Sequence, residues 1–397
     1  MSLGICGVRR SFRPLRFLVG GMWVWTVACG SGQTGAVVER GDMDTGAGVG
    51  TEATSAAAGE EFATAPGIAA PAADSETDSS ATSVDSPEVA APPAAAMPGQ
   101  DASGTDSPRS AVSDRDGGTE VRADGYRLVW QDEFDGLAID ASKWEHEVDC
   151  WGGGNNEDQC YVSDDKNSFV KDGALHIVAL ADQPSGAVAG PNADPNVVTR
   201  AYSSARLRTL GRGDWKYGRV EVAAQLPYGQ GLWPAIWMLP SEEVYGGWAR
   251  SGEIDILEAV NLRVPGETEN RVYGTLHYGD SWPQNVQSGG YADPSSDVTR
   301  GYHLYVIEWE EGELRWFVDD ELYLTQNEWH SEGNEFPAPF DQAFHLLLNV
   351  AVGGGWPGPT NSDTEFPQEM RVDYVRVFTC DADPQTGHGC GSRHSSP

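Results

Sequence analysis

The clearest pattern along the chain is an alternation of apolar and polar positions with a period of two. Over residues 219–226, Val, Ala and Leu alternate with polar neighbours, which is typical of a half-buried β-strand. Further runs rich in β-branched and aromatic residues cover residues 302–309, 314–318, 344–350 and 370–378. Gly, Pro, Asn and Asp clusters separate these runs, and no long amphipathic run has the helical period. We predict an all-β sandwich or jelly roll, whose topology the pattern leaves open.

Composition divides the chain into unlike parts. Residues 30–124 are mostly small or polar and carry 17 acids against 4 bases. Such a segment buries too little apolar surface to offset its chain entropy, so we predict a disordered linker. One folded domain should follow over residues 125–380, and then a tail, residues 381–397, to which the sequence assigns no role. The formal net charge of −34 argues against nucleic acid as a partner and leaves neutral polymers open.

The first 29 residues have the form of an export signal. Four arginines between residues 9 and 16 precede a short apolar stretch, residues 17–28. That stretch is shorter than the roughly 20 apolar residues that span a bilayer. It ends in a sequence, TVACG, that resembles a bacterial lipoprotein cleavage box with Cys29 as the lipidated residue. We expect a monomer exported to the outer membrane or cell surface, touching membrane only through this anchor. Ordinary cleavage near Ala28 would instead give a secreted protein.

Four further cysteines fall in the predicted exported domain and its tail. An oxidising compartment makes Cys150, Cys160, Cys380 and Cys390 disulfide candidates. Four cysteines permit three pairings. We favour the local pairs, Cys150 with Cys160 and Cys380 with Cys390, and free thiols are the alternative.

The most informative segment is residues 251–259, SGEIDILEA. Glu253 and Asp255 share one face of a strand, whereas Glu258 would point to the other face unless a bulge near residues 256–257 turns it back. Three crowded carboxylates would then have unequal pKa values, because neighbouring negative charge raises the pKa of the group that ionises last. Acetal hydrolysis needs one ionised carboxylate and one protonated carboxyl group. Asp255 could orient Glu253. The alternative is a solvated acidic strand face.

These residues resemble the signature of glycoside hydrolase family 16, in the bulged form typical of its laminarinases. Other segments match the family in the same order along the chain: residues 130–135 (WQDEFD), 152–159 (GGGNNEDQ), 229–240 (GQGLWPAIWMLP), 245–248 (YGGW), 274–279 (GTLHYG) and 349–354 (NVAVGG). The resemblance implies a concanavalin-like β-jelly-roll sandwich of two antiparallel sheets with a concave substrate cleft. It also implies retaining, endo-acting hydrolysis of β-1,3-glucan, with Glu253 as nucleophile and Glu258 as acid/base, and no cofactor for the chemistry.

Flat aromatic side chains can stack on the apolar faces of sugar rings. We predict three candidate sugar platforms. One is Trp248, which lies in the Gly-rich segment before the acidic strand. The others are Trp233 and Trp237, which are four residues apart and therefore on one strand face, although either could belong to the core. His277 should lie on the strand beside Glu258 and could bind that residue or a sugar hydroxyl; a structural role is the alternative.

The resemblance also implies glucan contacts by Asn156 and Arg206, although Asn155-Asn156 could be ordinary turn residues. It further implies a structural Ca²⁺ held by Glu133, the carbonyl of Gly173 and Asp373, unless these acids are simply exposed strand-end groups. Two other functions stay open: a non-catalytic β-glucan-binding protein on the same fold, and an enzyme for mixed-linkage glucan or another family substrate.

Overall fold

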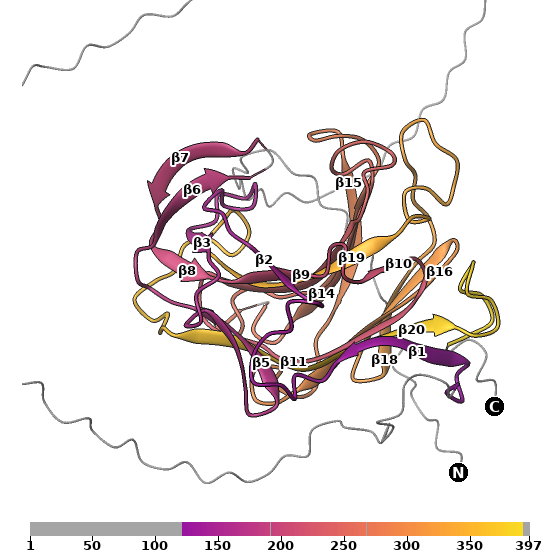
Figure 1. The fold of residues 1–397 in the computed structure, drawn as a ribbon, viewed down its shortest axis with the longest axis horizontal. Coiled ribbons are helices and arrows are strands. Elements are labelled where there is room, and N and C mark those ends of the chain that lie inside the picture. Colours follow the sequence, from indigo (N-terminus) through magenta and orange to yellow (C-terminus); the bar gives the residue numbers. More distant parts are fainter. Residues whose placement is uncertain (1–120, 191, 267, 392–397) are drawn as a thin grey trace, which may run out of the picture. The chain divides into compact units, whose positions relative to one another are not determined.

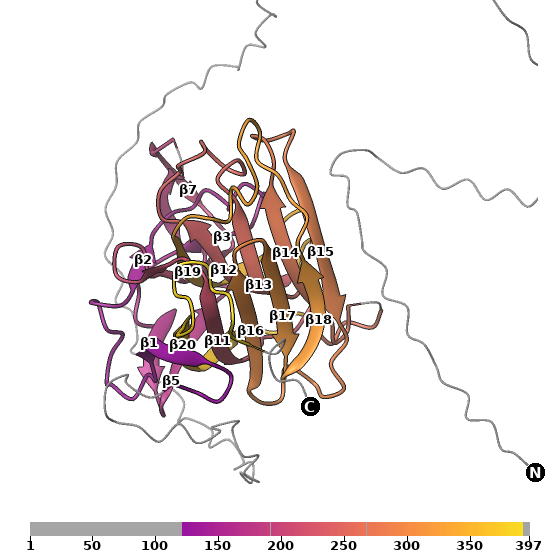
Figure 2. The same cartoon turned by 90° about the vertical axis from the view of Figure 1, so that its right-hand side faces the viewer.

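The computed structural model of the protein describes residues 121–391 apart from residues 191 and 267. Every regular element among them is a β-strand, which confirms the predicted all-β class. Two eight-stranded sheets form the two layers of the domain (Figures 1 and 2). No helix in this described part of the chain is long and apolar enough to cross a membrane.

The first layer, here called the front sheet, is antiparallel throughout. Its order is β15-β14-β13-β12-β19-β9-β2, and β10 pairs with β19. Its strands are β2 (Glu145–Glu147), β9 (Arg206–Arg208), β10 (Asp214–Trp215), β12 (Leu232–Pro240), β13 (Glu253–Glu258), β14 (Val272–Tyr278), β15 (Val286–Ala292) and β19 (Phe344–Val352).

The second layer, the back sheet, is also antiparallel. Its order is β18-β17-β16-β11-β20-β5-β4, and β1 pairs with β20. Its strands are β1 (Tyr126–Asp132), β4 (Ser168–Lys171), β5 (Ala174–Ala179), β11 (Gly218–Gln225), β16 (His303–Glu310), β17 (Glu313–Val318), β18 (Glu321–Gln326) and β20 (Gln368–Cys380).

Two short pairs of strands lie outside both sheets. β3 (Gln159–Tyr161) runs parallel to β8 (Tyr202–Ser204), and β6 (Ser185–Ala189) forms an antiparallel hairpin with β7 (Asp194–Thr199). In Figure 1 the β6–β7 hairpin stands on the opposite side of the front sheet from the back sheet. The alternation pattern did not predict this hairpin, because its residues are largely small, polar or exposed.

The core fills the space between the sheets and follows the predicted alternation. On β11, Val220, Val222 and Ala224 join the core cluster, and on β19 the even-numbered residues 344–352 do the same. The residues between them therefore point to the outer faces of their sheets. This alternation leaves one face of the front sheet free to carry functional side chains.

The folded domain extends past both boundaries drawn from the sequence. Arg122, placed in the linker, forms an ion pair with Glu221 of β11 at 2.7 Å. The tail also packs on the domain: the backbone N–H of Gly391 donates to the carbonyl of Asp124. The structure contains both local disulfides, Cys150–Cys160 and Cys380–Cys390. These are the two pairs favoured from the sequence, but local composition did not reveal the contacts of Arg122 and Gly391, because their partners are far away in sequence. The predicted signal, Cys29 and nearly all of the predicted linker lie outside the described residues.

Candidate active site

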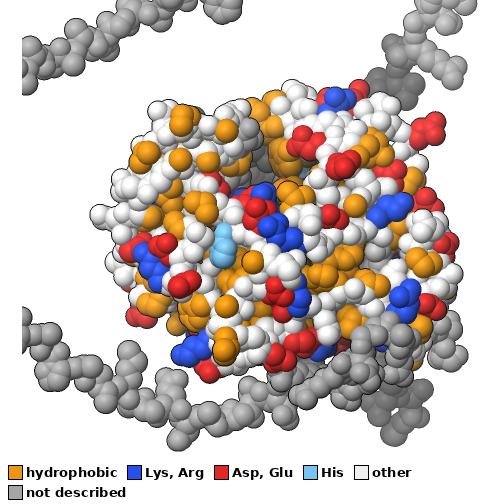
Figure 3. All heavy atoms as spheres, in the orientation of Figure 1, with side chains coloured by type: hydrophobic (Ala, Val, Ile, Leu, Met, Phe, Trp, Pro, Cys, Tyr) orange, Lys and Arg blue, Asp and Glu red, His pale blue; other side chains and the backbone are white. Residues whose placement is uncertain are grey.

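The free face of the front sheet carries the candidate residues. On β12, Leu232, Ile236 and Met238 pack in the core, so Trp233 and Trp237 lie on the opposite, free face, as their spacing of four predicted. Figure 3 shows the surface hollowed above this face, between the β6–β7 hairpin and the β15 side of the domain. We call this hollow the cleft.

The acidic strand β13 contains the bulge that the spacing of its acids required. The register with β14 shifts between Asp255 and Glu258, and the register with β12 shifts between Ile236 and Trp237. Ile254, Ile256 and Leu257 all join the core, so the extra residue is absorbed on the apolar side. Glu253, Asp255 and Glu258 are consequently all on the cleft side of one strand.

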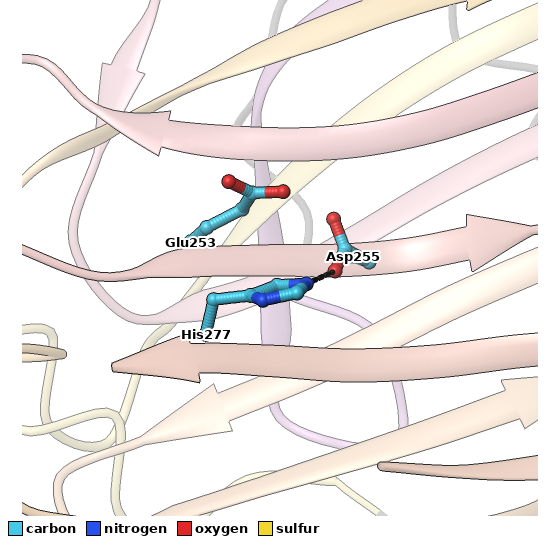
Figure 4. A group of neighbouring side chains, drawn as sticks. All are labelled: Glu253, Asp255 and His277. Atoms are coloured by element: carbon cyan, nitrogen blue, oxygen red, sulfur yellow. Dashed lines mark ion pairs between the residues drawn. The ribbon is translucent and has the colours of Figure 1, made fainter. Parts of the chain in front are cut away.

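Glu253 and Asp255 form a compact group with His277 of β14 (Figure 4). The indole N–H of Trp248 donates to Glu253, and Nε2 of His277 lies 3.2 Å from Oδ2 of Asp255. Asp255 is buried. Burial raises the pKa of Asp255 well above its ordinary value, and the charge of Glu253 and a hydrogen bond to it raise this pKa further. Asp255 is therefore suited to hold a proton that it shares with Glu253.

Glu258 has a different environment. It accepts a hydrogen bond of 2.9 Å from the indole N–H of Trp233. Burial is the largest cause that raises the pKa of Glu258 well above its ordinary value, followed by the charge of Asp255. The charge of His277 opposes this rise, as does the hydrogen bond from Trp233. A carboxyl group with a raised pKa keeps its proton to higher pH than an ordinary glutamate does, which suits it to act as a proton donor.

His277 has a different partner from the one that the sequence suggested. It lies on β14 beside β13, as expected, but its register partner is Glu253 and its close contact is with Asp255. The bulge displaces Glu258 along the strand, so that Glu258 is opposite Tyr273. His277 therefore influences Glu258 through its charge and lies in direct contact with Asp255.

Aromatic side chains flank the acids on both sides. Trp248 is 40% exposed, and its ring lies 5.7 Å from that of His277. On the other side, the ring of Trp356 packs edge-on against Trp233 at 5.3 Å and against Tyr273 at 5.0 Å. Sequence reasoning gave no role to Trp356 or Tyr273. The sequence did hold a weak indication of each position. Trp356 lies two residues after the GG of the NVAVGG motif, and Tyr273 alternates with core residues of β14, which predicts that it faces the cleft.

Trp237 is fixed by a chain of polar contacts. Its indole N–H donates to Oδ1 of Asn349 at 2.7 Å, and the Asn349 amide donates to the Tyr161 hydroxyl at 3.0 Å. Arg206 stacks on both aromatic rings, 4.2 Å from the centre of Tyr161 and 5.4 Å from that of Trp237. Arg206 is buried and pairs with Glu147. It thus supports Trp237 from the same face of the front sheet. Asn349 belongs to the NVAVGG motif, but the sequence assigned it no role.

The loop over residues 150–160 docks beside this floor. The N–H of Asp158 donates to the carbonyl of Val352 at 2.7 Å, and the N–H of Gly355 donates to that of Asn155 at 2.8 Å. Gly353 has a φ of +72°, and a side chain there would meet Asp158, so only glycine permits this close approach. Asn156 is exposed at the loop tip with a left-handed φ of 59°, a conformation that accounts for Asn as a turn residue.

The three residues predicted to bind calcium lie near one another on the back sheet, where β20 passes from β5 to β1. The registers of β1 and β5 on β20 place Glu133 and Gly173 near Asp373. Both carboxylate oxygens of Glu133, however, accept hydrogen bonds from Arg376, at 2.7 and 2.9 Å. A cation there would have to compete with that guanidinium group. Calcium binding stays a prediction.

Comparison with known proteins places this geometry in a family. The family model described as glycosyl hydrolases family 16 matches residues 156–376, more than half of the chain. Glucan endo-1,3-beta-glucosidase A1 of Niallia circulans is 42% identical over 292 residues, which are 68% of this chain and 41% of that protein.

Two similar proteins come from Rhodothermus marinus. Its beta-glucanase is 41% identical over 266 residues, which are 65% of this chain and 86% of that protein. The X-ray structure of a laminarinase from the same organism shares 39% identity with a TM-score of 0.55, covering 64% of this chain and 97% of that one. The chain thus spans less than half of the Niallia protein and most of the Rhodothermus proteins. On the strength of the family match and these similarities, the chain belongs to family 16 of the glycosyl hydrolases.

Proposed function

We propose that this protein hydrolyses internal linkages of β-1,3-glucan with retention of anomeric configuration, using Glu253 as nucleophile and Glu258 as acid/base. The observation that carries the proposal is the bulge of β13. It brings two carboxyl groups to one side of a strand and leaves them in unlike environments, as the two roles require.

The reaction takes two steps. The Glu253 carboxylate attacks the anomeric carbon while Glu258 transfers its proton to the departing glycosidic oxygen, so the glycosidic bond breaks as the glycosyl ester forms. Glu258, now ionised, then removes a proton from a water molecule, and the resulting oxygen attacks the same carbon and releases Glu253. Two inversions at one carbon give net retention.

The surrounding residues support these roles. The raised pKa of Glu258 favours the protonated form that the first step needs, and the cause of the rise is chiefly burial. The indole N–H of Trp248 donates to Glu253, and Asp255, whose pKa burial raises, is suited to hold a proton beside it. Trp233 and Trp356 offer aromatic surface beside Glu258, which suits the C–H faces of glucose rings. The relatives named above for 1,3-beta-glucan cleavage point to the same substrate class.

The substrate is tested by measuring reducing-sugar release from laminarin, lichenan, agarose and xyloglucan. We expect the highest kcat/KM on laminarin, with lichenan second if mixed-linkage glucan is also cleaved. NMR of the first products should show the β-anomer before mutarotation, and short oligosaccharides should appear early, as internal cleavage requires. Release from agarose alone would contradict the substrate, and an initial α-anomer would contradict retention.

The pH dependence should report the coupling of His277 to Glu258. The charge of His277 lowers the pKa of Glu258, so His277→Gln should raise that pKa. Activity requires protonated Glu258 and is lost as the pH rises through its pKa. The alkaline limb of kcat/KM should therefore move to higher pH in His277→Gln, as measured in a pH profile on laminarin.

Gln287→Ala is the matched control for this profile. Gln287 is the uncharged register partner of His277 on β15. Among the described residues it forms no hydrogen bond with the three carboxylates, so its substitution should leave the limb in place. A limb that stays fixed or moves to lower pH in His277→Gln would contradict the coupling.

A further inference from the structure

A second hollow lies on the outer face of the back sheet. It is a groove of about 520 Å³. Its lining includes Gln225 of β11, Arg371 of β20, Val178 of β5 and Phe169 of β4. Three of these belong to one row of register partners across the four strands, in which His176 of β5 lies between Arg371 and Phe169. We call it the back groove. Tyr228, which follows β11, also lines it.

The back groove and the cleft are on opposite sides of the sandwich. On β5, Leu175 and Ile177 pack in the core between the sheets, so His176 and Val178 point away from it. In Figure 1, β5 and β11 lie in the layer farthest from the β6–β7 hairpin and β15, which flank the cleft. A ligand in the back groove therefore cannot be the glucan segment that is being cleaved.

The back groove presents two supported aromatic rings. Arg263 stacks on the ring of Tyr228 with its guanidinium carbon 4.2 Å from the ring centre, and Tyr228 is still 36% exposed. Phe169 stacks on His176 with ring centres 4.7 Å apart and an interplanar angle of 12°. Rings held in place from one side lose little conformational entropy when a flat apolar surface packs against them.

Two amides of the back groove each have half of their hydrogen-bonding capacity free. Gln368 accepts from the N–H of Tyr228 through its carbonyl oxygen at 3.1 Å, which leaves its NH₂ group. Gln225 donates through its NH₂ group to the carbonyl of Thr299 at 2.8 Å, which leaves its carbonyl oxygen. One donor and one acceptor beside aromatic rings match the hydroxyl groups and C–H faces of a sugar.

The charges of the back groove are compensated locally. Glu369 pairs with both Arg371 and His176, at 2.5 and 2.9 Å, and Lys166 pairs with Asp182 at 2.7 Å. Ligands with net charge would gain little from a lining that is already neutralised, whereas a neutral polymer meets no repulsion. This balance favours an uncharged polysaccharide over a polyanion.

We propose that the back groove is a second binding site for neutral β-glucan, separate from the cleft. The identity of the sugar rests on the proposed function; the presence of a site rests on the groove itself. A protein with sites on both faces would stay attached to an insoluble glucan through the back groove while the cleft engages another chain. When both sites of one protein bind the same particle, the apparent affinity for the particle rises, because the second site binds at a high effective concentration of glucan.

The test measures sedimentation of the full chain with particles of insoluble β-1,3-glucan. Glu253→Gln is present in every variant of this assay, so that the particles are not digested. Adding Tyr228→Ala should weaken particle binding by up to about tenfold, the loss of roughly one aromatic stacking contact. With Glu253 restored, Tyr228→Ala should leave kcat/KM on soluble laminari-oligosaccharides unchanged.

Two control variants separate the ring from the fold. Tyr228→Phe keeps the ring and should bind particles as its parent does. Phe336→Ala removes an aromatic side chain that is 54% exposed and is not part of the back-groove lining, so it should also bind normally. If Tyr228→Ala lowers the thermal midpoint, Phe169→Ala provides the same test at the other aromatic ring of the back groove.

The two proposals fail separately. If folded Tyr228→Ala binds the particles as tightly as its parent does, the back groove is not a glucan site, and the cleft chemistry stays intact. The same conclusion follows from Phe169→Ala where that variant replaces Tyr228→Ala. Absence of laminarin hydrolysis by the unsubstituted chain would overturn the proposed function. Weaker particle binding with unchanged soluble kinetics would support the second site.

Discussion

Glu253→Gln should lower kcat on laminarin by roughly 10⁴–10⁶-fold, the scale on which loss of a catalytic nucleophile is felt. An amide cannot form the glycosyl ester, yet glutamine has nearly the volume of glutamate. Its carbonyl oxygen can still accept from the indole N–H of Trp248. The variant should therefore fold and bind laminarin with little change in Kd, as calorimetry on the inactive protein would measure.

Glu243→Gln is the matched control for this substitution. Glu243 is exposed in the loop before β13 and has no contact with the three carboxylates, so the same change of charge there should leave kcat unaltered. Turnover by Glu253→Gln within about tenfold of the parent would exclude a covalent role for this residue, because the glycosyl ester cannot form without its carboxylate.

Glu258→Ala should lower kcat/KM on laminarin by roughly 10²–10⁴-fold, the usual contribution of general acid–base catalysis. The loss should largely disappear in the first step when the leaving group is a dinitrophenolate, which departs without a proton. Glycosyl-enzyme would then accumulate, because no base activates water. Azide should rescue turnover, since it attacks as an anion and needs no base, and its product should be the β-glycosyl azide.

Several outcomes would contradict this assignment. Near-parent rates of Glu258→Ala on laminarin would show that another group donates the proton, and an α-glycosyl azide would contradict a covalent intermediate on Glu253. Thermal unfolding serves as the folding control, because the substitution also leaves the indole N–H of Trp233 without its acceptor. Glu258→Gln keeps an acceptor there and should show the same kinetic loss.

The bulge links the fold to this chemistry. A regular strand would turn Glu258 toward the core, where Ile256 and Leu257 now pack, and would leave one acid in the cleft without its counterpart. The inserted residue also displaces Glu258 along the strand, so that its partners are Trp233 and Tyr273, while Glu253 keeps Trp248 and Asp255. One local irregularity therefore produces both the shared face and the unlike environments.

Much of this could be predicted from the sequence because it depends on periodicity. Alternation decides which side chains of a strand share a face, so the all-β class, the core face of β11 and the common face of Trp233 and Trp237 were accessible. The spacing of five between Glu253 and Glu258 implied a bulge, because a regular strand would put the two side chains on opposite faces and the chemistry needs both in the cleft.

Only the tertiary structure decided which strands are neighbours. Alternation carries no information about register between strands that are far apart in sequence, because pairing is settled by the packing of the whole sheet. Three features depend on such pairing. They are the contact of His277 with Asp255, the support of Trp237 by Asn349 and Tyr161, and the packing of residues 121–124 and 381–391 on the domain. The back groove depends on it most, because its floor joins four strands that span residues 168 to 380.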